Sequence, residues 1–120
     1  MMNGLRTAAL IVALVAAMSA CASVIKPDFP RLVTGGVQFT HLAQSARTVH
    51  VVGSFNGWGK GATPMKRVGD TGVWAAEVVL RPGEYTFMYL VDGTEWMVPP
   101  LAEDFVTDGF GQINGVVIVR

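Results

Sequence analysis

The side chains best suited to bind a ligand are aromatic, and one of them lies on a glycine-rich stretch in the middle of the chain. The segment Gly53-Ser54-Phe55-Asn56-Gly57-Trp58 follows a β-branched run and delivers Trp58 onto a loop of small and polar residues. An Asn-Gly pair tolerates a left-handed backbone, so the chain can turn sharply here. A tryptophan in such a loop either folds back to close one end of the core or presents its flat apolar face to a ligand. The small and polar neighbours favour the second interpretation.

Two further residues have chemistry that complements Trp58. Trp96 comes just after the Asp92-Gly93 turn, and Asn114 begins the last apolar segment. An indole face can take the C–H side of a sugar ring. An asparagine amide both donates and accepts hydrogen bonds, so it can bridge neighbouring hydroxyls. These residues are far apart in the chain, and their spacing does not show that they converge.

The chain offers little to an enzyme or a metal site. Its two histidines, His41 and His50, fall inside predicted strands, and Cys21 is its only cysteine, whereas zinc usually needs three or four converging ligands. Most carboxylates fall in predicted turns, where they are ordinarily solvated, while a glycosidase needs two of them across a cleft. Glu103-Asp104 is a weak candidate for a catalytic acid. We therefore predict no catalytic residues, no metal and no cofactor.

The start of the chain resembles a secretory signal peptide. Arg6 precedes an apolar run over Thr7–Ala17, which is too short to span a bilayer. Met18-Ser19-Ala20-Cys21 resembles a bacterial lipobox, in which the cysteine is lipidated and becomes the new N-terminus. The alternative is ordinary cleavage after Ala22. We predict a signal peptide of the lipoprotein type over 1–20, with lipidation at Cys21.

Residues 21–35 are predicted to form a tether, because they contain two prolines and show no clear period. Arg6 is one of nine Lys and Arg residues, so eight remain beyond residue 20 against nine Asp and Glu. No basic patch stands out, so we predict no nucleic-acid partner.

From residue 36 to the end, short β-branched segments alternate with turn signals. We expect strands at 37–42, 47–52, 64–68, 73–80, 85–91, 94–98 and 113–119, with an irregular stretch at 99–111. This pattern predicts an all-β fold, an antiparallel β-sandwich of about seven strands over 36–120. The expected core residues are Phe39, Val49, Val51, Trp74, Tyr85, Phe87 and Tyr89.

At this point the residues match a known family. The stretch from about residue 37 to residue 120 resembles the family-48 carbohydrate-binding modules, which include the glycogen-binding domain of the AMP-activated protein kinase β subunit and the early-set N-terminal domains of branching and debranching enzymes. Four segments carry the resemblance, in the expected order and spacing: Val49–Trp58, Leu80–Tyr85, Tyr89–Gly93 and Gly109–Asn114. The resemblance implies an immunoglobulin-like (early-set) sandwich that binds α-1,4-linked glucan.

The resemblance also assigns residues to carbohydrate binding. Trp58 and Trp96 correspond to the family's two stacking tryptophans, and Asn114 corresponds to its hydroxyl-binding asparagine. Phe110 stands where the family has a leucine that enters the curved glucan chain. Met88 stands at a lysine position, which removes up to three hydrogen-bond donors.

We accordingly predict a lipid-anchored, non-catalytic module that binds glycogen-like α-glucan at the bacterial cell envelope. In many Gram-negative bacteria an aspartate directly after the lipidated cysteine holds a lipoprotein at the inner membrane. This chain has Ala22 at that position, which favours the outer membrane if the host is Gram-negative. The alternative is a docking domain on the same fold that has lost sugar binding and contacts an envelope protein. Retention of both tryptophans argues against that loss, and Met88 argues mildly for it.

Overall fold

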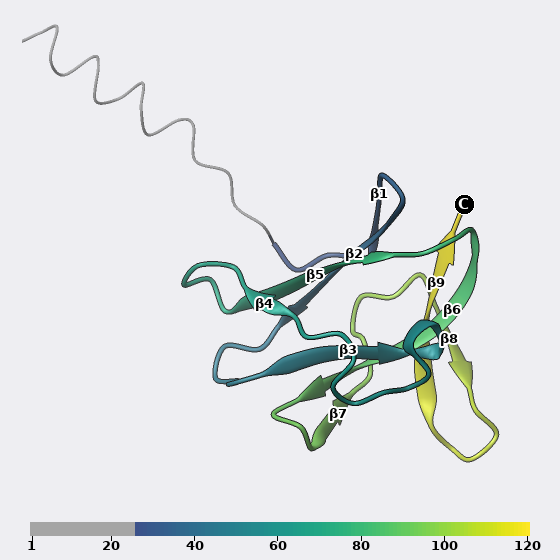
Figure 1. Ribbon diagram of the computed structural model, residues 1–120. Coiled ribbons are helices and arrows are strands. Elements are labelled where there is room, and N and C mark those ends of the chain that lie inside the picture. Colours follow the sequence, from purple (N-terminus) through teal and green to yellow (C-terminus); the bar gives the residue numbers. More distant parts are fainter. Residues whose placement is uncertain (1–25) are drawn as a thin grey trace, which may run out of the picture.

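Two antiparallel β-sheets pack face to face in the computed structural model, which describes residues 26–120 (Figure 1). One sheet has the strand order β1-β2-β5-β4, and the other has the order β3-β6-β9-β8 with β7 added alongside β6. The strands are β1 (Arg31–Val33), β2 (Gly36–Leu42), β3 (Val49–Gly53), β4 (Lys66–Arg67), β5 (Val73–Val79), β6 (Gly83–Val91), β7 (Glu95–Met97), β8 (Asp104–Thr107) and β9 (Ile113–Val119). A 3-10 turn, η1 (Ser54–Asn56), follows β3.

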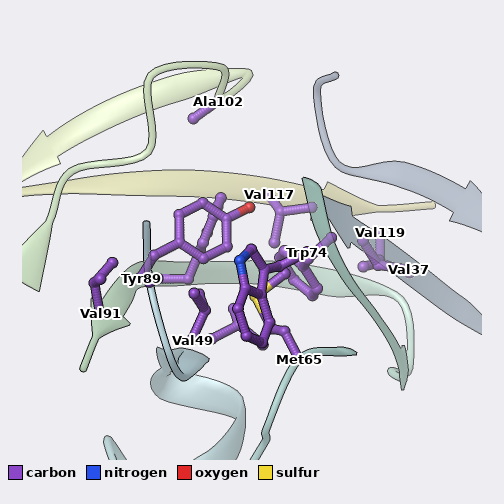
Figure 2. Packing of buried hydrophobic residues seen from close by; sticks show 13 residues of the cluster. Val37, Val49, Met65, Trp74, Tyr89, Val91, Ala102, Val117 and Val119 are labelled. Atoms are coloured by element: carbon purple, nitrogen blue, oxygen red, sulfur yellow. The ribbon is translucent and has the colours of Figure 1, made fainter. Parts of the chain in front are cut away.

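The core lies between the sheets because the strands alternate apolar and polar residues with a period of two. On β6, Phe87, Tyr89 and Val91 belong to the central apolar cluster, and Tyr85 packs against its rim. Figure 2 shows Tyr89 and Trp74 among valines contributed by both sheets. The predicted core is thus confirmed, with Tyr85 only half-buried.

The all-β antiparallel sandwich predicted from the sequence is confirmed, with nine strands among the described residues instead of about seven. All seven expected strands are present, with ends that differ by up to two residues. Two strands, β1 and β8, were not predicted.

Strand β1 corrects the boundary of the tether, which was predicted to reach residue 35. Gly35, at φ 77°, closes a hairpin between β1 and β2. Before it, Pro30 is buried, and the backbone N–H of Asp28 donates to Thr40 Oγ1 at 3.0 Å. The domain therefore begins before residue 36, because pairing with β2 across a tight hairpin orders a segment that has no periodic pattern of its own.

Strand β8 lies inside the stretch predicted to be irregular. It pairs with β9, with Val106 opposite Asn114. The segment before it closes over Gly115, where an added Cβ would lie 2.7 Å from Pro99 Cγ, so only glycine allows this approach. Turn residues on both sides of a four-residue strand hid its pattern in the sequence.

The predicted signal segment, Cys21 and the start of the tether lie outside the described residues. Within residues 26–120, no helix has the length and apolar character needed to cross a membrane.

Candidate functional site

A groove of about 640 Å³ lies on the outer face of the five-stranded sheet, opposite the core. Its floor comes from β6, whose outward side chains alternate with the core residues described above. Strands β7, β8 and β9 and two loops supply the walls. The lining residues are Trp58, Thr86, Met88, Trp96, Val106, Thr107, Asp108, Phe110, Gln112 and Asn114.

Two strands share one edge of β6, and this arrangement brings Trp96 and Asn114 together. Strand β9 pairs with the first half of β6, and β7 pairs with its last three residues, where Leu90 faces Trp96. Extending the β9 register by one residue beyond the pair Phe87–Gly115 places Asn114 beside Met88. Facing residues on paired antiparallel strands lie on the same side of the sheet. Met88 therefore lies between Asn114 and Trp96 at the junction of β9 and β7.

The loop after β3 brings Trp58 to the other side of the groove. Phe55 turns inward and stacks on Phe39 of the core, with ring centroids 5.5 Å apart. Three residues later, the backbone N–H of Trp58 donates to the Gly53 carbonyl at 2.9 Å. Trp58 adopts φ 60°, a left-handed conformation that costs a residue with a side chain about 1–3 kcal/mol. The fold holds Trp58 in this conformation, and its ring, 38% exposed, lines the groove.

Phe110 lies at the tip of the β8–β9 turn and is 92% exposed. The turn is ordered by Asp108, whose Oδ1 accepts hydrogen bonds from the backbone N–H groups of Phe110 at 2.7 Å and Gln112 at 3.2 Å. A large apolar ring is thus presented to solvent at the rim of the groove.

The structure brings all five residues assigned to carbohydrate binding to this one groove. Met88 is 5% exposed and forms part of its floor, Asn114 is half-buried, and Trp58, Trp96 and Phe110 are exposed. The convergence that sequence spacing left open is therefore observed.

Five further residues line the groove and were not predicted from the sequence. Thr86 lies on the outward face of β6, two residues before Met88, and this alternation was the available signal. Val106, Thr107, Asp108 and Gln112 belong to the β8–β9 hairpin, which was predicted to be irregular.

The chemistry of the groove suits an uncharged ligand that has both apolar faces and hydroxyl groups. Two indoles, Met88 and Phe110 offer apolar surface, and the amides of Asn114 and Gln112 offer donors and acceptors. Asp108 is the one charged side chain among the residues that line it, and Oδ1 of that carboxylate already accepts two backbone hydrogen bonds.

Two titratable residues outside the groove, His41 and Tyr89, are buried. His41 is buried and stacks on Tyr89 with ring centroids 4.3 Å apart, and this burial lowers the pKa of the imidazole. Burial also raises the pKa of the Tyr89 hydroxyl, which donates to the Thr40 carbonyl. Trp74 donates from Nε1 to the Ala43 carbonyl at 3.0 Å, as befits a core residue. Within residues 26–120, no three His, Cys, Asp or Glu residues cluster as metal ligands would.

A two-sheet antiparallel sandwich with an aromatic groove on one outer face is typical of ligand-binding modules. Comparison with protein families then gives the particular one. The model of the glycogen recognition site of AMP-activated protein kinase matches residues 37–120, and the chain belongs to this family. The early-set, immunoglobulin-like sandwich that the sequence resemblance implied agrees with this membership.

Similar curated proteins are 1,4-alpha-glucan branching enzymes. The enzyme of Pseudomonas syringae pv. tomato is 45% identical over 65 residues, which are 53% of this chain and 9% of that enzyme. The enzyme of Mycobacterium ulcerans is 33% identical over 73 residues, which are 61% of this chain and 10% of that enzyme. The chain thus spans about a tenth of the length of these relatives.

Proposed function

We propose that this protein binds α-1,4-linked glucan chains, such as glycogen or maltodextrins, in the groove on its five-stranded sheet and catalyses no reaction on them. The observation that carries the proposal is the convergence of Trp58, Trp96 and Asn114 on one groove. Membership of a glycogen-recognition family and similarity to branching enzymes support the same ligand class.

The two tryptophans stack on glucose rings, and Asn114 bonds their hydroxyls. Phe110 contacts the inner, apolar side of the curved glucan chain. Met88, on the floor of the groove, contacts the same glucan chain. Because the groove is shallow and open, we expect a Kd near 1 mM, which corresponds to about −4 kcal/mol. Two stacking contacts and a few hydrogen bonds suffice for this after the costs of association.

Titration of the soluble domain with maltoheptaose and β-cyclodextrin, followed by calorimetry or NMR, tests the proposal. We expect saturable binding to both sugars and none to a β-1,4-linked oligosaccharide of equal length. The absence of binding at tens of millimolar sugar would refute the proposal. It would favour the alternative, a docking domain, which requires the exposed faces of Trp58 and Trp96 to meet a protein.

We further propose that Cys21 carries lipid and holds the domain at the cell envelope, on the outer membrane if the host is Gram-negative. The support is the lipobox-like segment Met18–Cys21 directly behind an apolar run. One acyl chain binds a membrane only marginally, whereas two or more anchor a protein stably.

Metabolic labelling with a fatty-acid analogue tests the anchor. We expect wild-type protein to be labelled and sedimented with membranes, and Cys21→Ser to lose the label. A soluble, unlabelled mature chain that begins at Ser23 would instead show ordinary cleavage after Ala22.

A further inference from the structure

Asn56 is a residue that the sequence suggested only as half of an Asn-Gly turn. In the structure its side chain makes three hydrogen bonds, and the groove does not include it. Oδ1 accepts from the Gly53 N–H at 3.0 Å. Nδ2 donates to the Val51 carbonyl and to Thr63 Oγ1, also at 3.0 Å. The amide therefore uses its acceptor and both donors within the protein.

These bonds join the two ends of the loop that carries Trp58. Val51 and Gly53 belong to β3, where the loop begins, and Thr63 lies where it returns to β3, since the Val51 N–H donates to the Thr63 carbonyl at 3.1 Å. Trp58 lies between these ends, and its own N–H is bonded to the Gly53 carbonyl. Asn56 thus fixes both the departure and the return of the loop.

The backbone conformation of Trp58 explains why the loop needs the hydrogen bonds of Asn56. Gly57 and Trp58 are consecutive left-handed residues, at φ 65° and 60°. A residue with a side chain persists in this region only when its surroundings over-determine it. Neither Gly57 nor Gly61 has any atom within 4 Å of where a Cβ would lie, so packing does not confine the loop at these two points. Phe55 anchors the start of the loop by packing on Phe39. The hydrogen bonds of Asn56 add a constraint that also reaches the returning end at Thr63.

We infer that Asn56 is a positioning residue for ligand binding: by tying the loop to β3 and to Thr63, it holds the Trp58 indole in the orientation that lines the groove. This inference rests on the proposed glucan-binding function. Asn56 would thus contribute to binding without contacting the ligand itself.

The decisive variant is Asn56→Asp, which keeps the size and shape of the side chain. The carboxylate has no N–H to offer the Val51 carbonyl, so the oxygen that replaces Nδ2 faces another acceptor. Gln44→Glu is the matched control, because it makes the same amide-to-carboxylate change at an exposed position outside the groove. Thr63→Val is a milder second variant, since it removes one of the three bonds.

Two readouts separate positioning from a general loss of structure. With 5-fluorotryptophan incorporated, 19F NMR gives separate signals for Trp58, Trp74 and Trp96. In Asn56→Asp we expect the Trp58 signal to shift or broaden, while the signal of buried Trp74 stays in place. We expect maltoheptaose affinity to fall at least tenfold in Asn56→Asp, about two- to fivefold in Thr63→Val, and not at all in Gln44→Glu.

The results also distinguish this inference from the proposed function. If wild-type protein binds maltoheptaose and Asn56→Asp binds it within twofold, with the Trp58 signal unmoved, the positioning role is refuted and the binding function stands. If Asn56→Asp does not fold, the Trp58 signal and the maltoheptaose affinity of Thr63→Val decide whether the positioning role holds. If the wild type does not bind, the proposed function fails, and the response of the Trp58 signal alone tells whether Asn56 orients the indole.

Discussion

Trp96 tests the groove most directly among single residues, because it is 40% exposed on a three-residue edge strand. Trp96→Ala removes one stacking face, so we expect maltoheptaose binding to disappear. The variant also uncovers part of Leu90, its fully buried partner on β6, and we expect a stability loss of about 1 kcal/mol. Calorimetry and urea unfolding measure the two effects. A loss of about 3–5 kcal/mol, typical of a core aromatic, would make Trp96 structural.

A substitution at Met88 tests how much sugar affinity is lost because the floor of the groove is apolar. Met88→Lys places an ammonium group between Asn114 and Trp96, where its three N–H donors can reach sugar hydroxyls. Because residue 88 is 5% exposed, the lysine stem must stay on the floor while the charge extends into the groove. We expect affinity for maltoheptaose to rise about threefold to tenfold, as measured by calorimetry. Unchanged affinity in a folded variant would show that Met88 lies out of reach of the sugar.

At the scale of elements, the turn between β6 and β7 is attached to the start of β3 by Asp92. Its Oδ1 accepts from the backbone N–H groups of Arg47 at 2.7 Å and Thr48 at 3.1 Å. These bonds, first that from Thr48 and then that from Arg47, lower the pKa of the Asp92 carboxyl. A lowered folded-state pKa means that the stabilisation is present above the unfolded value of 3.8 and is lost as pH falls through the folded value.

Asp92→Asn should therefore be less stable than the wild type at pH 7, and the difference should shrink as the pH falls below about 4. Urea unfolding at pH 7, 4 and 2.5 gives the comparison, with Asp70→Asn, in an exposed turn, as the control. A stability difference that does not change with pH would mean that the charge of Asp92 contributes nothing. Because β7 carries Trp96, we expect weaker sugar binding as well.

The elements were largely predictable where a strand carries its own alternating pattern. β6 and β9 show that pattern, and their ends match the prediction within two residues. β1 and β8 do not, because they are short edge strands ordered by pairing with β2 and β9. In each case the partner strand across a hairpin turn supplies the order, and the short strand carries too few alternating residues to be recognised in the sequence.

The same limit applies to the candidate site. Residue types and family resemblance selected Trp58, Trp96 and Asn114. The proximity of Trp96 and Asn114 depends on β7 and β9 sharing one edge of β6, and Trp58 reaches them through the loop after β3. The role inferred for Asn56 depends on hydrogen bonds to both ends of its loop. Neither the strand arrangement nor these bonds could be read from spacing.

For the whole molecule, ligand binding should appear as thermal stabilisation. A ligand at ten times its Kd stabilises the folded state by about 1.4 kcal/mol, and a domain of this size gains about 4–8 °C per kcal/mol. Allowing for weaker binding on heating, we expect β-cyclodextrin to raise Tm by about 5 °C in a scanning calorimeter. Trp96→Ala should show no rise. An equal rise in that variant would place the sugar outside the groove.

The described chain enters the domain along β2 of the four-stranded sheet (Figure 1). The groove opens on the outer face of the other sheet. The start of the described chain and the groove therefore lie on different sides of one small body. A branched polymer many times wider than the domain can approach the groove from the side away from residue 26. If the segment before residue 26 is fixed to a surface, many copies of this protein can bind the same polymer particle at once. Weak individual contacts would then add up to durable adhesion.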